Sequence, residues 1–230
     1  MTPPLTSNPE SDKIQSYPLF DWLRFALASI VVLGHVGFKF APWMTRALAV
    51  QVFFALSGWL IGGILLKSQA KDMPRFFFNR ATRIWIPYAV AIAMLYGVAL
   101  LKEGPSFFWF KYLALDLTFT HQLFTVFPEA LREMPLGGSG NQFWSIAVEE
   151  QFYLIAPVIM LFVPRGRTLP IWLAIVLMTL IFQWNAAAIS MGVCGAIIEA
   201  KTGFSRSRLT ALVASALVVG LAFLLAASIW

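Results

Sequence analysis

Long apolar runs separated by short polar connections make up most of the chain. The stronger runs approach the ~20 residues that a helix needs to cross a bilayer. They are Trp22–Phe38, Ala47–Leu66, Ile84–Leu101, Gln142–Val163, Pro170–Ile189 and Leu209–Trp230, with weaker runs at Phe107–Phe127 and Ala186–Ala200. The pattern predicts an all-α fold, a polytopic transmembrane helical bundle of about seven or eight membrane segments.

Composition supports a membrane protein. Hydrophobic residues are 59% of the chain and charged residues 12%, and the mean hydropathy is +0.75. An average soluble domain carries about 25% charged residues. The lipid bilayer is therefore an expected partner of this chain.

The formal net charge of +6 does not indicate a nucleic-acid partner, because the basic residues gather in short connections between apolar runs. The largest group follows the second run and marks that connection as cytoplasmic by the positive-inside rule. It contains Lys67, Lys71, Arg75, Arg80 and Arg83.

The chain begins with a polar, proline-bearing stretch that lacks the apolar core of a signal peptide. We expect residues 1–20 to be a disordered cytosolic tail and residues 21–230 to be one membrane-embedded domain. The single cysteine, Cys194, lies in an apolar stretch, which favours a packing role.

The first apolar run carries an arginine and a histidine. Arg24 and His35 are eleven residues apart, or about three helical turns, so they share one helix face with an axial separation of about 16 Å. Intramembrane ionisable groups are candidates for function. Alternatively, the arginine extends to the lipid headgroups and the histidine is hydrogen-bonded between helices.

Two further stretches combine small or basic residues at helical spacing. Ser57, Gly58, Gly62 and Gly63 in the second run would let a neighbouring helix approach closely, and Gly58 and Gly62 have the spacing of a small-residue contact. Arg80 and Arg83 are three apart and are expected on one face at the start of the third helix, where they can bind phosphates. Contact with lipid headgroups is the alternative for this pair.

A glycine-rich loop precedes a helix with two consecutive carboxylates. Trp144, Ser145 and Glu149 follow the loop, and Glu149 and Glu150 differ by about 100° around the helix. One of the two is therefore expected to point into the bundle and to pair with a cation. A purely structural ion pair remains an alternative.

Four stretches together resemble the acyltransferase-3 family of integral membrane acyltransferases. They are FDWLRFALASIVVLGH, VFFALSGWLIGG, RFFFNRATRIWIP and NQFWSIAVEEQFYL, in the family's order over roughly residues 20–160. The resemblance implies transfer of an acyl group, usually acetyl, from cytosolic acyl-CoA to a hydroxyl of an extracytoplasmic glycan or related acceptor. Family members are commonly longer, so the family's C-terminal helices are expected to be missing.

The resemblance assigns functional positions to Arg24, His35, Arg80, Arg83 and Glu149. We expect the three arginines to bind acyl-CoA, with its phosphates on Arg80 and Arg83. His35 would act as the base on the acceptor hydroxyl, and Glu149 would orient its imidazole. The sequence is equally compatible with a two-step route in which the acyl group is first transferred to the histidine.

Ser57, Trp144 and Ser145 are supporting residues, with the two serines ranked below histidine as acyl carriers. No bound cofactor is expected, and no metal, because His35 and His121 are isolated in the sequence. The competing functions are a proton-coupled membrane transporter and an inactive truncated homologue. The expected location is the bacterial inner membrane, as a multi-pass protein.

Overall fold

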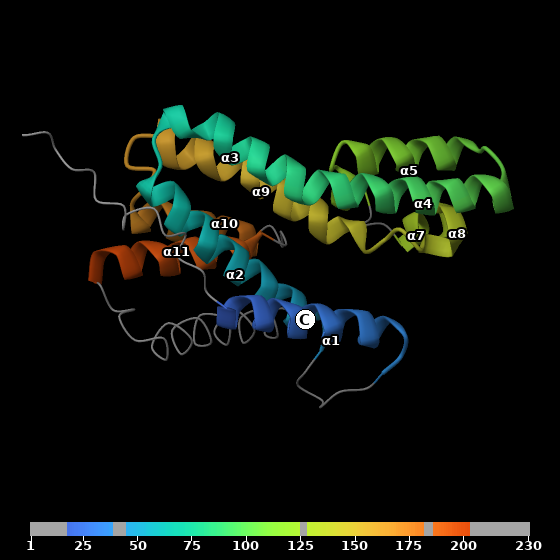
Figure 1. Cartoon of the computed structure of the whole chain (residues 1–230), viewed down its shortest axis with the longest axis horizontal. Coiled ribbons are helices and arrows are strands. Elements are labelled where there is room, and N and C mark those ends of the chain that lie inside the picture. The colour runs from blue at the N-terminus through green and yellow to red at the C-terminus, as the bar shows by residue number, and fades with distance from the viewer. Residues whose placement is uncertain (1–17, 39–44, 125–127, 182–185, 203–230) are drawn as a thin grey trace, which may run out of the picture. The chain divides into compact units, whose positions relative to one another are not determined.

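The computed structural model describes residues 18–38, 45–124, 128–181 and 186–202, and these residues form helices and turns without strands. The all-α expectation is confirmed for this part of the chain. Most of the predicted N-terminal tail and the whole run Leu209–Trp230 lie outside the described residues. The elements are α1 (Pro18–His35), α2 (Arg46–Lys67), the 3-10 turn η2 (Ala70–Asp72), α3 (Met73–Arg80), the π-helical turn η3 (Ala81–Trp85), α4 (Ile86–Glu103), α5 (Phe107–Leu117), α6 (His121–Phe124), α7 (Pro128–Glu133), α8 (Pro135–Gly138), α9 (Phe143–Phe162), α10 (Leu169–Ile181) and α11 (Ala187–Thr202), as seen in Figure 1.

The chain divides into two units, Met1–Ala49 and Val50–Trp230, which are described separately. The first unit contains α1. The second contains most of α2 and every later helix, and its core and candidate site are built within it.

Three helical stretches of the described residues are long and apolar enough to cross a membrane: Arg46–Lys67, Ala70–Glu103 and Phe143–Phe162. Trp22–His35 and Leu169–Ile181 are apolar but shorter. The predicted run Pro170–Ile189 is divided between α10 and α11. The expected count of about seven or eight segments is therefore not confirmed.

The predicted third helix starts earlier than expected. Ala70–Glu103 is one helical stretch that passes from η2 through α3 and η3 into α4. Pro74 lies in the first turn of α3, where its missing N–H costs no hydrogen bond. Pro87 cannot donate to a carbonyl four residues earlier, and the π-helical turn η3 directly precedes α4 at this point. The basic segment is thus mostly helix and not a connecting turn.

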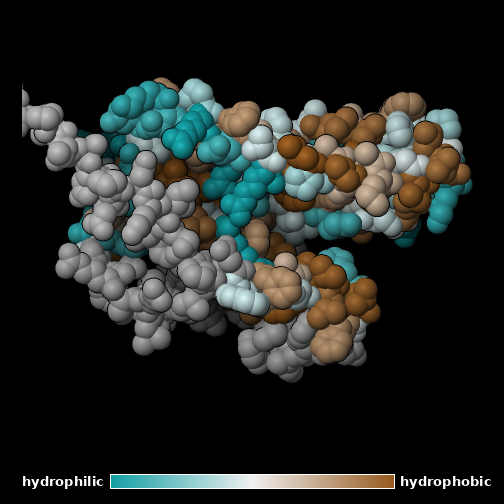
Figure 2. Space-filling view, viewed as in Figure 1, coloured by the Kyte–Doolittle hydropathy of each residue, from teal (hydrophilic) through white to brown (hydrophobic). Residues whose placement is uncertain are grey.

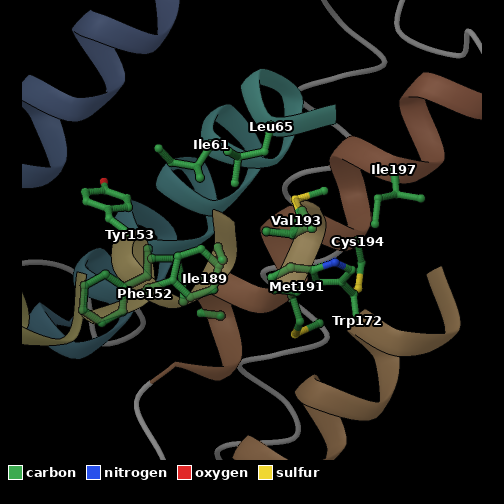
Figure 3. Close-up of a cluster of buried hydrophobic side chains, with 14 of the residues drawn as sticks. Ile61, Leu65, Phe152, Tyr153, Trp172, Ile189, Met191, Val193, Cys194 and Ile197 are labelled. Carbon is green, nitrogen blue, oxygen red and sulfur yellow. The ribbon is translucent and has the colours of Figure 1, made fainter. Parts of the chain in front are cut away.

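The larger hydrophobic core lies where α2, α9, α10 and α11 meet. Figure 3 shows Ile61 and Leu65 of α2 near Val193 of α11. Phe152 and Tyr153 of α9 belong to the same cluster of buried residues. Cys194 is free and buried in this core, as a packing role requires.

Glycines bring α2 and α11 into close contact. A Cβ added at Gly58 would lie 1.8 Å from the Ile189 carbonyl oxygen, and one at Gly192 would lie 2.0 Å from that of Ala55. A Cβ at Gly62 would lie 3.0 Å from the Cβ of Ala196. The predicted small-residue contact of Gly58 and Gly62 is confirmed, with α11 as the partner helix.

A second, smaller core contains aromatic residues of α4 and α5. Tyr88, Tyr96 and Tyr112 are buried there together with Phe143 of α9. The predicted run Phe107–Phe127 does not form one spanning helix, because α5 ends at Leu117 and Phe119 adopts a positive φ of 54°. A helix of this length, 11 residues, covers about 16 Å, too little to cross a bilayer.

An ion pair joins α5 to α7 at the edge of this core. Lys111 Nζ lies 2.8 Å from Glu133 Oε2, which also accepts a hydrogen bond from the Tyr112 hydroxyl. The hydrogen bond from Lys111 lowers the pKa of Glu133, and the same bond raises the pKa of Lys111. Both side chains are about one-third exposed, so solvent weakens the pair.

Much of the apolar surface of α4 and α5 is not covered by protein. In the most apolar window of Ala70–Glu103 only 22% of the residues are buried, against 50% for Arg46–Lys67. Figure 2 shows hydrophobic residues gathered over α4 and α5. The exposed large side chains there are Ile86, Val90, Met94, Val98, Leu100, Leu101, Phe107, Phe108, Phe110 and Leu117. This surface suits contact with lipid chains.

Gly58→Ala should destabilise the protein by about 1–3 kcal/mol or more, because the new methyl group would press on the backbone of Ile189. Gly63→Ala is the matched control on the same helix, since its Cβ meets nothing within 4 Å. The control should be neutral or slightly stabilising. Thermal unfolding in detergent measures both, and equal melting temperatures for the two variants would contradict the α2–α11 contact.

Candidate functional site

Two carboxylates and a tyrosine of α9 form the centre of the candidate site. Glu150 is 4% exposed, and its Oε2 accepts a hydrogen bond of 2.8 Å from Trp85 Nε1 of η3. The Tyr153 hydroxyl donates to Glu149 Oε1, one turn earlier on the same helix. α9 thus brings Glu150 against the turn that follows the arginine-bearing helix α3, with Glu149 beside it in the sequence.

Arg80 lies against the aromatic rings of this region. Its guanidinium carbon is 4.5 Å from the centre of the Tyr153 ring and 5.8 Å from that of Phe76. Among the described residues, acidic and basic side chains meet within 4.0 Å in Lys111–Glu133 and Asp116–His121, the second being an ion pair only when the imidazole is protonated. No carboxylate of the described residues therefore lies within 4.0 Å of Arg80. Cation–π contacts position the guanidinium while its hydrogen-bond donors are not used by an ion pair.

The two neighbouring glutamates differ in burial. The helical spacing left open which glutamate points into the bundle, and the family resemblance assigned the functional position to Glu149. Glu150 is instead the more buried, because Trp85 of η3 covers its face of α9, and Glu149 is half-buried. Each glutamate has its own hydrogen-bond donor, Trp85 for Glu150 and Tyr153 for Glu149.

Arg80 and Arg83 do not share one environment. Arg80 is half-buried at the end of α3, whereas Arg83 is exposed within the π-helical turn. The expectation that both sit at a helix N-terminus is wrong, because α3 begins at Met73 and continues through η3. Any anion bound by this pair therefore interacts with the guanidinium groups and not with free N–H groups of a helix end.

The three supporting residues lie on α2 and at the start of α9. Ser57 is 1% exposed, and its hydroxyl has no hydrogen-bond partner among the described residues. Trp144 packs edge-to-face on Phe54, with ring centres 6.0 Å apart. The Ser145 hydroxyl donates to the Gln142 carbonyl at 3.1 Å, a local contact of the first turn of the helix.

Arg24 and His35 belong to the first unit. Both lie on α1, in agreement with the predicted first helix. His35 is exposed in the last turn, and its Nδ1 lies 2.8 Å from the Val31 carbonyl oxygen. This hydrogen bond fixes Nδ1 as the donor and leaves Nε2 as the acceptor in the neutral ring.

Sequence reasoning missed two features. Trp85 was given no role, although the indole N–H of a tryptophan in an apolar stretch needs a hydrogen-bond partner, and this was the available signal. His121 was treated as isolated, but its Nδ1 lies 2.5 Å from Asp116 Oδ1 across a turn. Among the described residues no cluster of His, Cys, Asp or Glu is arranged to hold a metal ion.

Fold and site together define a helical membrane protein with a half-buried arginine near one buried and one half-buried carboxylate. The chain belongs to the acyltransferase-3 family, because the family profile, described as an acyltransferase domain, matches residues 17–230. The resemblance seen in the sequence is thereby confirmed.

Curated relatives are bacterial O-acetyltransferases by name. The peptidoglycan O-acetyltransferase OatA of Listeria monocytogenes is 34% identical over 158 residues, which cover 63% of this chain and 24% of that protein. A Staphylococcus aureus protein with the name putative O-acetyltransferase is 29% identical over 170 residues, which cover 64% of this chain and 25% of that protein. The chain spans about a quarter of the length of these relatives. Comparison with solved structures gave no significant match.

The hydrogen bond from Trp85 to Glu150 should be measurable as an energetic coupling. Trp85→Phe should cost about 1–3 kcal/mol, because it leaves a buried carboxylate without its donor. In a Glu150→Leu background the same tryptophan change should cost much less, since the carboxylate is absent. Chemical or thermal unfolding of the two single variants and the double variant gives the coupling, and additive effects would contradict it.

Proposed function

We propose that this protein transfers an acetyl group from acetyl-CoA on the cytosolic side to a hydroxyl group of an extracytoplasmic glycan. Family membership and the names of the relatives support acyl transfer as the reaction class. Peptidoglycan, the acceptor named for the Listeria relative, is the acceptor we propose here.

One observation carries the donor side of this proposal. Arg80 is held on Tyr153 and Phe76 without an ion pair among the described residues. A guanidinium fixed in this way can bind a phosphate group with two parallel hydrogen bonds. We assign Arg80 and Arg83 to the phosphates of CoA, and Arg24 to the same substrate on the basis of the family resemblance.

His35 is the proposed base for the acceptor hydroxyl. A hydroxyl is a weak nucleophile until a base removes its proton, and histidine suits this task near neutral pH. The attack breaks the thioester C–S bond, forms the ester C–O bond and releases CoA as the thiol. The pairing of His35 with Glu149 stays a sequence-based prediction.

The reaction class can be tested against a transporter. Purified protein in proteoliposomes is given acetyl-CoA with a labelled acetyl group, and free CoA and internal label are measured. An acetyltransferase releases CoA in proportion to an added glycan acceptor. Uptake of label without CoA release would contradict the proposal and support transport, and neither signal would support an inactive homologue.

Arg80→Lys and Arg83→Lys should each weaken acetyl-CoA binding, because an ammonium group is a point charge without the planar fork. The loss should be larger for Arg80→Lys, since that change also replaces the planar guanidinium that packs on the Tyr153 ring. Equilibrium binding of acetyl-CoA in detergent measures the effect. Arg75→Lys is the control, an exposed position of the same basic segment, and affinities equal to wild type in all three variants would refute the phosphate assignment.

His35→Ala should lower the rate of acetyl transfer by about 10²–10⁴-fold, as expected for loss of a positioned base. Protein level and membrane insertion should not change, because His35 is an exposed residue in the last turn of α1. Ser29→Ala on the same helix is the control. The base assignment fails if His35→Ala retains a rate within a few-fold of wild type at equal protein level.

A further inference from the structure

A second polar cluster lies in the small core, and the proposed reaction does not use it. His121 and Asp116 have 1% and 0% exposed side chains, and His121 Nδ1 lies 2.5 Å from Asp116 Oδ1. The Tyr96 hydroxyl donates to Asp116 Oδ2 at 2.6 Å, and the Tyr88 hydroxyl donates to the Asp116 backbone carbonyl at 3.0 Å. The aspartate is therefore held on three sides inside an apolar core.

The hydrogen bonds of Asp116 determine how the imidazole is oriented. Both carboxylate oxygens accept, one from Tyr96 and one from His121. Nδ1 of His121 therefore carries the hydrogen, and in the neutral ring Nε2 is left as an acceptor with a free lone pair. This is the arrangement in which a carboxylate positions a histidine to meet another group.

His121 Nε2 is buried and has no hydrogen-bond partner among the described residues. Buried side-chain nitrogens are paired in the large majority of cases, with protein, water or a ligand. Apolar packing alone does not explain a histidine whose other nitrogen is fixed by a buried aspartate. A hydroxyl group is a suitable partner, because it can donate to the neutral ring and accept from the charged ring.

The cluster is linked to the candidate site through α6 and α9. Gln122, next to His121, donates to Gln151 Oε1 at 2.5 Å, and Gln151 donates to the Phe119 carbonyl at 2.7 Å. Gln151 follows Glu150 directly, and Phe119 packs on Trp85, with ring centres 5.8 Å apart. The histidine is thus attached to the same stretch of α9 that bears the two glutamates.

The contacts of the cluster with α4 run in the direction away from the basic segment. Asp116 is bonded to Tyr88 and to Tyr96, which lie about 4 Å and about 16 Å of helix beyond Trp85. The basic segment is the cytosolic end in the proposed topology. Asp116 and His121 therefore lie toward the side on which a glycan acceptor would enter.

We propose that His121 Nε2 binds a hydroxyl group of the carbohydrate acceptor and that Asp116 is its positioning residue. This inference rests on the proposed function for the identity of the acceptor. Access to Nε2 requires α6 to open, and α6 is a single turn of four residues held to α9 through Gln122. The role is binding, so it affects acceptor affinity and leaves acetyl-CoA affinity unchanged.

His121→Asn separates this role from a structural one. The asparagine amide can still donate to Asp116, but it has no atom at the position of Nε2. With the disaccharide N-acetylglucosaminyl-N-acetylmuramic acid as the acceptor probe, H121N should raise the acceptor KM about tenfold or more. Its melting temperature and its affinity for acetyl-CoA should equal those of the wild type.

His121→Gln is the complementary variant. Its amide can reach the Nε2 position but loses the bond to Asp116, so its melting temperature should fall. Unchanged acceptor KM in H121N would overturn the proposal.

A spectroscopic titration tests binding even where a variant fails to fold. The chain has only 2 histidines, so ¹⁵N-histidine labelling of His35→Gln leaves the imidazole of His121 as the only labelled ring. Adding the disaccharide should shift the Nε2 resonance and leave Nδ1 nearly unchanged, and a fully O-methylated disaccharide is the control that should give no shift. A silent Nε2 at saturating disaccharide would overturn the proposal. Absence of CoA release by the wild-type protein would instead refute the proposed function, so the two failures are distinguishable.

Discussion

The hydrogen bond between Trp85 and Glu150 is the interaction on which the site depends. A buried carboxylate in an apolar bundle is costly unless its oxygens find donors, and Trp85 supplies one from the π-helical turn. Trp85 lies in the turn that leads from α3 to α4, so the bond also fixes the arginine-bearing helix against α9. Arg80 then meets Tyr153 one turn further along α9. The charged groups of two helices are thereby gathered without a direct ion pair between them.

Helix packing provides the frame for this arrangement. Gly58 and Gly192 let α2 and α11 approach at backbone distance, and α9 packs its buried face against the resulting core. In lipid, helix association relies on such close packing because the hydrophobic effect does not favour protein over lipid chains. The large apolar surface left on α4 and α5 is consistent with a lipid environment, because lipid chains can cover apolar side chains that the protein does not bury.

The sequence could predict those features that depend on local pattern. The apolar lengths of α2 and α9 and the close contact of Gly58 and Gly62 follow from composition and spacing, and the structure confirms them. Two features could not be predicted from local pattern. Glu150 is buried because of Trp85, which is 65 positions away, so the angle between Glu149 and Glu150 alone could not decide which of them faces protein. The continuation of α3 into α4 through a π-helical turn likewise overrides the expectation that a basic, proline-containing segment is a loop.

His121 illustrates a different limit of sequence reasoning. Its partner Asp116 is only five residues away. In a regular helix or strand, however, side chains at that spacing do not lie on the same face. The contact exists because α5 ends at Leu117 and Phe119 takes a positive φ, which turns the chain back on itself. The positive φ of Phe119 is energetically unfavourable for any residue with a Cβ, and a glycine would adopt it without strain. Its ring stacks on Tyr88 with centres 5.1 Å apart and packs on Trp85, and its carbonyl accepts from Gln151, so tertiary contacts offset that cost. The strained turn therefore has a structural consequence: it joins the Asp116–His121 pair to the helix that carries the candidate site.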